Sequence, residues 1–408
     1  MTGYSRVASA DRTRSATSGL RPEIQALRAL AVLLVLAYHL WDSRVPSGYV
    51  GVDDFFVISG FLITAQLVRE VERTGSIRLA EFWARRIRRL LPAAFVVILV
   101  TIAAVMLLLP RSLWRATLLE AAASALYVEN WASIARHLHI VPWADYPLAV
   151  EHFWTLSVEE QFYLVWPLLI LAGLGVAALL RRRPATARAR LGIVAIVLVC
   201  AFAVSFAYSV WLTLQHPLHA ARSTPSVAWE FAAGGMLALL PALSTLSISE
   251  RVRGVLHVTA SWAGLLLILT SSLWPGLWLP PAPAAVAPVL GAALFIWAGS
   301  SRSLLSPTRY GAVRPVQFVG DVSYGIYLWH QPIYVLVLLA TGENVRGVGG
   351  LAVVAAAILL GWLSKRYIED PFRTSPFWQP LGRTYGFAAL GMVTICTIAL
   401  MGWIAAGG

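Results

Sequence analysis

Long apolar runs separated by short polar segments recur along the whole 408-residue chain. Each run has about 17 to 25 residues, which is enough for a helix to cross the roughly 30 Å of hydrocarbon in a bilayer. The run over residues 93–109, whose helix is expected to begin at the helix-breaking Pro92, is continuously apolar. The strands of a membrane barrel instead alternate between apolar and polar residues. The pattern therefore predicts an all-α fold, a polytopic bundle of transmembrane helices.

The positions of basic residues between the runs predict the topology. Under the positive-inside rule these clusters mark the cytoplasmic side. All of them lie on that side if residues 113–135 do not cross the membrane. Glu120 and Glu129 make that stretch too polar to face lipid throughout. We expect it, with the loop 137–151, to be re-entrant or interfacial. The N-terminus is then cytoplasmic and the C-terminus extracytoplasmic. Eleven crossings are predicted, over residues 24–41, 49–68, 93–109, 153–180, 191–214, 227–243, 255–273, 284–298, 316–340, 351–364 and 385–404.

Composition supports a membrane protein of the inner or plasma membrane. With 58% hydrophobic and 13% charged residues, the chain has too little polar surface for a soluble globule, so lipid is its expected surroundings. A net charge of +12 raises the question of nucleic acid, but the basic residues form short clusters between apolar runs, and we exclude that partner. We expect residues 1–22 to form a flexible arm and residues 23–408 a single transmembrane domain.

Several polar residues lie inside the first two predicted spans, where ionisable groups are costly. His39, near the outer end of the first, can accept a hydroxyl proton at physiological pH; the alternative is an interfacial histidine among aromatic residues. Asp53 and Asp54 open the second span and either orient a histidine or cap the helix. Ser59 precedes Gly60, a pair that allows close approach of a backbone or ligand.

A basic cluster, Arg85-Arg86-Ile87-Arg88-Arg89, lies between the second and third predicted spans. Arg86 and Arg89 are three residues apart and share a helix face, so their planar guanidinium groups suit phosphates such as those of coenzyme A. A topology signal or a site for anionic lipid would look similar.

A third polar cluster enters the span over residues 153–180, beginning at Trp154. Glu159 and Tyr163 share a face at i, i+4, while Ser157 with Glu160 fits a capping box.

Two later spans also carry polar groups. Glu230 lies inside one, and Tyr327 and His330 share a face of another. The predicted topology puts His39, Glu159, Glu230 and His330 in the outer half and the arginine cluster inside. A cavity open to both sides would explain both sets.

Taken together, these motifs resemble the membrane-bound acyltransferase-3 family, whose members acylate surface polysaccharides, O-antigens, peptidoglycan and macrolides. By that resemblance His39 corresponds to the essential histidine of the first helix, and Arg86 with Arg89 to an R-x-x-R motif. Arg28, Ser59, Glu159 and Tyr163 also fall on family motif positions. The matching segments span nearly the whole chain: 27–39, 51–60, 85–92, 154–167, 222–235, 324–332 and 369–373.

The resemblance implies transfer of an acyl group, acetyl by family habit, from cytosolic acyl-CoA to a hydroxyl of a cell-surface glycan. His39 would be the general base, with no metal, and transfer would be direct or through a protein group, Ser59 or His330. Alternatives are acylation of a macrolide or other small molecule, and polysaccharide or lipid transport; the broken helices of inverted-repeat transporters are not apparent. Some family members carry a C-terminal SGNH domain, which we expect to be absent here although it would attach at this C-terminus.

Overall fold

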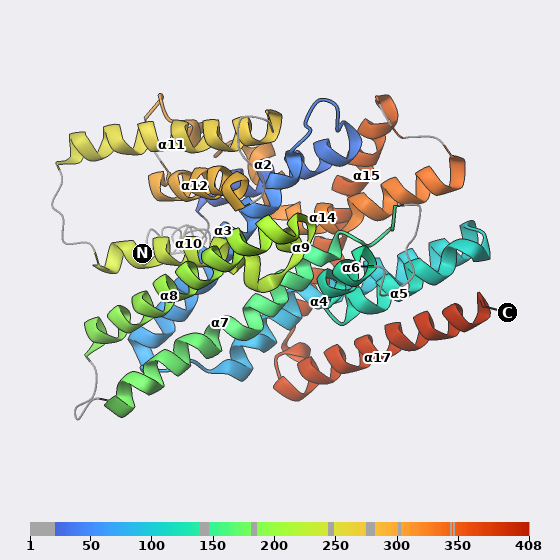
Figure 1. Ribbon diagram of the computed structural model, residues 1–408, viewed down its shortest axis with the longest axis horizontal. Helices are drawn as coiled ribbons and strands as arrows, with labels where there is room; N and C mark the ends of the chain where they lie inside the picture. Colours follow the sequence, from blue (N-terminus) through green and yellow to red (C-terminus); the bar gives the residue numbers. More distant parts are fainter. Residues whose placement is uncertain are drawn as a thin grey trace, which may run out of the picture.

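The computed structural model describes residues 21–138, 147–180, 186–243, 249–274, 282–300, 303–342, 345 and 347–407. The predicted arm thus lies almost wholly outside the described residues, as do residues 181–185 of a predicted basic cluster. The described part is helical and contains no strand (Figure 1). Its main helices are α2 (Pro22–Leu40), α3 (Gly51–Thr74), α4 (Leu79–Leu108), α5 (Trp114–Ala125), α6 (Glu129–His137), α7 (Phe153–Leu180), α8 (Ala187–Gln215), α9 (Pro217–Arg222), α10 (Thr224–Leu243), α11 (Glu250–Leu273), α12 (Ala282–Ala298), α13 (Pro307–Tyr310), α14 (Arg314–Thr341), α15 (Val348–Ser364), α16 (Asp370–Thr374) and α17 (Leu381–Ala405).

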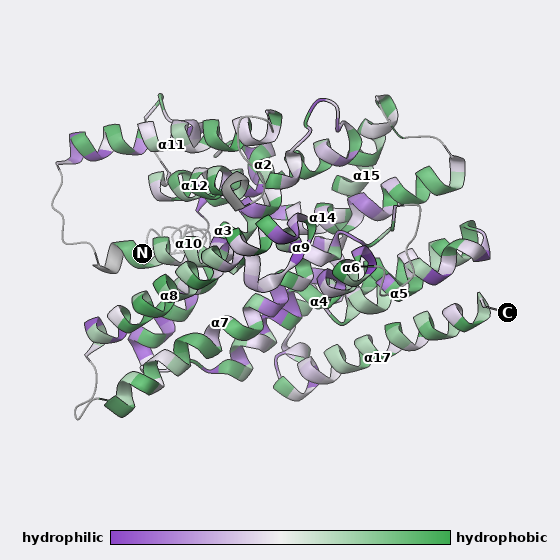
Figure 2. Cartoon of the chain, viewed as in Figure 1, coloured by the Kyte–Doolittle hydropathy of each residue, from purple (hydrophilic) through white to green (hydrophobic). Residues whose placement is uncertain are grey.

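The lengths and composition of these helices confirm a polytopic membrane protein. Nine helical segments of the described chain are long and apolar enough to cross a bilayer. The other two predicted crossings coincide with α10 and with α12. The apolar part of α12, Ala285–Ala298, is shorter than those of the nine segments. Figure 2 shows hydrophobic residues along the peripheral helices α7, α8 and α17, and hydrophilic residues gathered toward the middle of the bundle. Such a distribution suits a bundle surrounded by lipid.

The polar stretch predicted not to cross is divided between the short helices α5 and α6. Its charged groups find partners inside the protein: Arg136 donates to Glu129 and lies 3.9 Å from Glu120, which accepts a 3.1 Å bond from the Val150 amide. Burial still raises the pKa of Glu129 to about 8, against the opposing effect of the Arg136 charge. Part of the adjoining predicted loop, residues 139–146, lies outside the described residues.

The predicted start of the third span at Pro92 is wrong. Helix α4 begins at Leu79 and passes through Pro92, because a buried proline removes one backbone donor and neighbouring helices compensate for the loss within a membrane. The arginine cluster therefore lies within a long helix rather than in a connection, and its side chains can point into the bundle.

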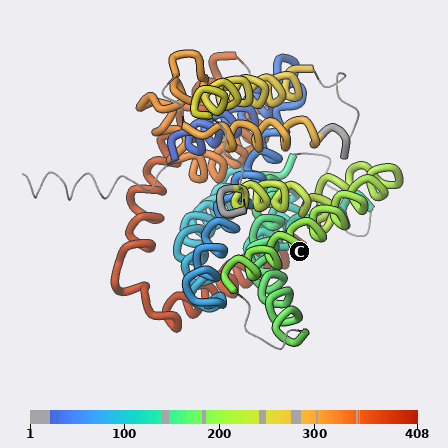
Figure 3. The backbone as a smooth tube through the Cα atoms, turned by 90° about the vertical axis from the view of Figure 1, so that its left-hand side faces the viewer, coloured from blue at the N-terminus to red at the C-terminus, as the bar shows by residue number. Residues whose placement is uncertain are grey.

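Close backbone packing fixes α3 against α10. A side-chain carbon added at Gly60 would lie 1.9 Å from the Phe231 carbonyl oxygen, and one at Gly234 would lie 2.0 Å from that of Val57. Small residues at such contacts let helices approach closely in membranes. Around this pair, α2 packs on α3 and α14, α11 on α12, and α17 covers α4 and α5 along the edge of the bundle (Figure 3).

Candidate active site

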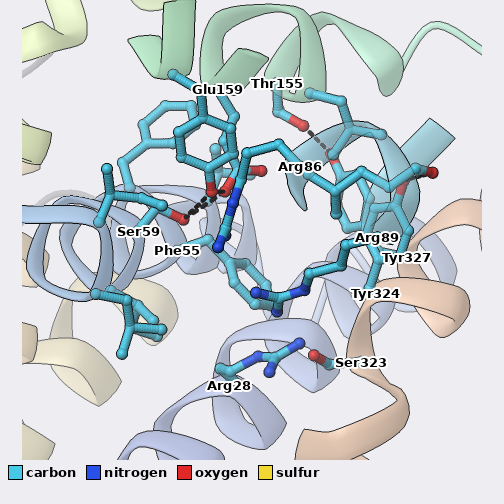
Figure 4. Close-up of a pocket in the computed structure, with 18 residues that line it drawn as sticks. Arg28, Phe55, Ser59, Arg86, Arg89, Thr155, Glu159, Ser323, Tyr324 and Tyr327 are labelled. Atoms are coloured by element: carbon cyan, nitrogen blue, oxygen red, sulfur yellow. Dashed lines mark hydrogen bonds between the residues drawn. The ribbon is translucent and has the colours of Figure 1, made fainter. Parts of the chain in front are cut away.

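A cavity of about 90 Å³ lies at the centre of the bundle, between α2, α3, α4, α7 and α14. Figure 4 shows arginine side chains entering it from two sides and a hydrogen-bonded polar group on a third. Seven residues singled out from the sequence meet there: Arg28, Ser59, Arg86, Arg89, Glu159, Tyr163 and Tyr327. We call this the arginine cavity.

One wall of the arginine cavity is a hydroxyl–carboxylate network. Ser59 Oγ and the Tyr163 hydroxyl both donate to Glu159 Oε1, and the Tyr163 hydroxyl lies 3.2 Å from Ser59 Oγ. The predicted pairing of Glu159 with Tyr163 on one face of α7 is confirmed. The third member of the network, Ser59, comes from α3. The close packing of α3 on α10 at Gly60 fixes its position.

Three guanidinium groups face this network. Arg86 donates to the Gln66 side chain at 3.0 Å and lies 5.9 Å from the centre of the Tyr163 ring, and Arg28 donates to Gln25 at 3.3 Å. Among the described residues, neither of these arginines nor Arg89 has a carboxylate within ion-pair distance. Their charge is therefore available to an anion entering the cavity.

Arg85, from the same basic cluster, does not line the arginine cavity. It points instead to Glu70, 3.6 Å away. On a helix, residues 85 and 86 point about 100° apart, so only one of the two faces the interior.

A second and larger cavity, of about 1010 Å³, adjoins the first and shares Arg28, Leu62, Arg89 and Tyr324 with it. We call it the vestibule. Two carboxylates line it, Asp321 and Glu369, against seven cationic side chains: Arg21, Arg28, Arg69, Arg89, Arg253, Lys365 and Arg373. This excess of positive charge favours a polyanionic ligand.

Most of these vestibule cations were interpreted from the sequence as topology signals alone. They come from helices far apart in the chain, so no local spacing marked them. The motif over residues 369–373 was the available signal, and it follows a π-helical turn at Lys365–Glu369, a feature frequent at functional sites.

A cluster of three histidines lies beyond the arginine cavity. The ring centre of His330 is 5.2 Å from that of His39 and 5.1 Å from that of His152. His39 Nδ1 lies 2.9 Å from the Val35 carbonyl, and His330 Nδ1 lies 2.6 Å from that of Tyr327. Each of these two rings can thus donate one N–H to the backbone and present its other nitrogen as a base. The sequence analysis predicts no role for His152, which directly precedes α7.

Tyr327 lies between the histidines and the arginine cavity. Its hydroxyl is 2.7 Å from Thr155 Oγ1 and donates to the His152 carbonyl at 3.0 Å, and its ring centre is 5.2 Å from that of His330. Within the described chain, the cavity lining includes Tyr327 and Thr155 but none of the three histidines. The arginine cavity therefore ends at Tyr327 and Thr155 and does not include His39.

Carboxylates do not orient His39 as predicted. Asp53 is hydrogen-bonded to Glu230 on α10, and both carboxylate oxygens of Asp54 are buried without a partner in the described part of the chain. Neither caps α3, whose N-terminus has no side-chain cap. Within the first turn of α3, Asp53 points to α10, whereas Gly51 packs against the backbone of α2 at Ala31.

The predicted capping box at the start of α7 is also wrong. Ser157 lies inside the helix, and its Oγ accepts a 3.1 Å bond from the Glu129 amide. Trp154, one turn earlier, is half-buried with the Arg222 guanidinium 5.9 Å from its ring centre. Arg222 is paired with Glu151 at 2.9 Å, so this region is a polar cluster near the histidines.

Comparison with known proteins gives the family. Residues 21–401 match the family described as "Acyltransferase domain". The chain belongs to this acyltransferase family. No solved structure matches it, and in the described part of the chain no three His, Cys, Asp or Glu side chains are placed to hold a metal ion.

Curated relatives of this acyltransferase-family protein are longer than the chain. It is 32% identical over 370 residues to "Peptidoglycan O-acetyltransferase OatA" of Listeria monocytogenes, covering 87% of this chain and 56% of that protein. It is 31% identical over 366 residues to "O-acetyltransferase OatA" of Staphylococcus aureus, covering 87% of this chain and 58% of that protein. The chain thus spans somewhat more than half the length of these relatives.

Proposed function

We propose that this protein is a membrane O-acyltransferase that moves an acetyl group from acetyl-CoA to a hydroxyl of a cell-wall glycan. Family membership supports acyl transfer. The two relatives are named as a peptidoglycan O-acetyltransferase and an O-acetyltransferase, which supports acetyl as the acyl group and a cell-wall glycan as the acceptor.

The vestibule supports acyl-CoA as the donor, and this observation carries the proposal. Coenzyme A bears a pyrophosphate and a 3′-phosphate, and the cationic vestibule leads to the guanidinium groups of Arg28, Arg86 and Arg89. Arginine suits phosphate because its planar fork donates two hydrogen bonds at once. The positive-inside rule puts this basic end in the cytosol, where acyl-CoA is found.

His39 is the proposed base for the acceptor hydroxyl. At the 1.5 Å rise of a helix it lies about 16 Å beyond Arg28 along α2, so the histidines are displaced toward the opposite side of the membrane. An imidazole with one nitrogen bonded to a backbone carbonyl keeps the other free to take a proton. The polar cluster at Trp154 and Arg222 offers the stacking surface and hydrogen-bond donors that a sugar would need.

Reconstitution into vesicles tests the proposal. Protein-containing vesicles receive radiolabelled acetyl-CoA and a soluble peptidoglycan fragment, and both free CoA and labelled glycan are measured. We expect equal amounts of the two products, with Arg86→Ala slowing both and Arg85→Ala leaving both unchanged. Movement of glycan across the membrane without CoA release would show a transporter instead and would overturn the assignment.

A further inference from the structure

Ser59 stands out among the hydroxyl groups that line the arginine cavity. Its Oγ donates to the Glu159 carboxylate and lies 3.2 Å from the Tyr163 hydroxyl, while its side chain still lines the cavity (Figure 4). Ser323, on the opposite wall, has a buried Oγ without a hydrogen-bond partner in the described part of the chain. The two serines share the cavity, but only Ser59 is held by a carboxylate.

A hydroxyl that donates to a carboxylate is arranged as a nucleophile with its base. Hydroxyl groups are weak nucleophiles on their own, and an adjacent base activates them by accepting the proton during attack. The Tyr163 hydroxyl can also donate to the negative oxygen that forms when a carbonyl is attacked. Arg86, over the Tyr163 ring at 5.9 Å, adds positive charge to the same wall.

The position of Ser59 puts it ahead of the histidines for a donor entering from the vestibule. The vestibule adjoins the arginine cavity and shares lining residues with it, including Arg28 and Arg89. Beyond Ser59, the contact between Tyr327 and Thr155 at 2.7 Å closes the way to His39. A donor whose phosphates lie on the vestibule cations therefore reaches Ser59 with its thioester before it can meet the acceptor bound near His39.

We propose that Ser59 accepts the acyl group as a covalent ester before the glycan receives it, an inference that rests on the proposed acyl-CoA donor. Ser59 Oγ attacks the thioester carbonyl carbon, the new C–O bond forms and the C–S bond breaks. The serine proton passes to Glu159 and then to the departing sulfur, which leaves as the free thiol of CoA.

The glycan then resolves the ester. Its hydroxyl oxygen attacks the same carbonyl carbon and the bond to Ser59 Oγ breaks. The proton that the acceptor loses to its base, His39, is returned to Ser59 Oγ. The Tyr327–Thr155 contact has to open before the glycan hydroxyl can reach the ester on Ser59. Splitting the reaction in this way allows CoA to remain on the basic side while the acyl group alone passes to the other.

The test uses purified protein and radiolabelled acetyl-CoA without any acceptor. After a short incubation and an acid quench, the protein is digested and the labelled peptide is identified by mass spectrometry. We expect one acetyl group on Ser59, released with a matching amount of free CoA. Ser124→Ala, which changes a buried serine of α5 outside both cavities, should label like wild type. Ser59→Ala should lose the label while binding acetyl-CoA as before.

A Ser59→Cys variant keeps the test valid if the alanine variant does not fold. Its acetyl group should appear as a thioester, recognised by rapid release with neutral hydroxylamine. Turnover in the presence of glycan without any label on residue 59, or a label on another residue, would overturn the inference while leaving the acetyltransferase assignment intact. Failure of wild-type protein to bind acetyl-CoA would instead overturn the proposed donor, and this inference with it.

Discussion

Replacing Arg86 by alanine should weaken acetyl-CoA binding about 10- to 100-fold. Arg86 lines the arginine cavity, and within the described chain its hydrogen-bond partner is the neutral Gln66 side chain, so its charge is available to a phosphate. A hydrogen bond to a charged group contributes about 1.5–3 kcal/mol, and about 1.4 kcal/mol corresponds to a tenfold change in affinity. The affinity of Arg86→Lys for acetyl-CoA should lie between those of wild type and Arg86→Ala, because a lysine keeps the charge but lacks the planar fork.

Isothermal titration of purified protein with acetyl-CoA measures this effect. Arg85→Ala is the matched control: it removes the same charge from the adjacent position, but its partner is Glu70 at 3.6 Å and it does not line the cavity. Its affinity should stay within about twofold of wild type, as for a surface change of roughly 0.5 kcal/mol. If Arg86→Ala bound as tightly as wild type, the arginine would serve topology alone and the donor site would lie elsewhere.

Three further changes test other parts of the account. Glu159→Gln should slow acetyl transfer by about 10²–10⁴-fold, the usual contribution of a general base, with acetyl-CoA affinity in titration almost unchanged. His39→Ala should abolish glycan labelling while the labelled acyl-enzyme still forms; normal glycan labelling would remove His39 as the base. Gly60→Ala should lower the thermal stability by about 1–3 kcal/mol, because its Cβ would lie 1.9 Å from the Phe231 carbonyl. Gly175→Ala, with nothing within 4 Å, is its control, and equal melting temperatures would contradict the packing argument.

The fold could be predicted from the sequence because bilayer thickness acts directly on chain composition. Every crossing must be apolar over roughly 20 residues, so a one-dimensional pattern locates helices such as α8 and α17. Pro92 misled the prediction because a proline that would break an exposed helix is tolerated within a packed membrane bundle. The sequence therefore predicts helix boundaries near polar clusters less accurately than the spans themselves.

Parts of the site that depend on one helix could also be predicted. The i, i+4 spacing brings Glu159 and Tyr163 together, and the i, i+3 spacing puts Arg86 and Arg89 in one cavity. Pairings between helices could not be predicted. Asp53 faces α10 rather than His39, because helix rotation is set by packing contacts such as Gly60 against Phe231. The sequence indicates that Gly60 allows a close approach, but not which helix makes it.

The histidine cluster and the vestibule escaped prediction for the same reason. His152 and His330 are separated by a large part of the chain, yet their ring centres are 5.1 Å apart. Arg253 and Lys365, on different helices, line one vestibule. Only the family motifs pointed to some of these residues, without indicating what they contact.

Mass spectrometry of cell-wall glycans most directly tests whether this protein acetylates them. Glycans are compared between cells that carry the gene, cells that lack it, and deletion cells complemented with wild-type protein or with His39→Ala. We expect O-acetyl groups to disappear with the gene and to return with the wild-type protein but not with the variant. Unchanged O-acetylation in the deletion strain would contradict the proposed function.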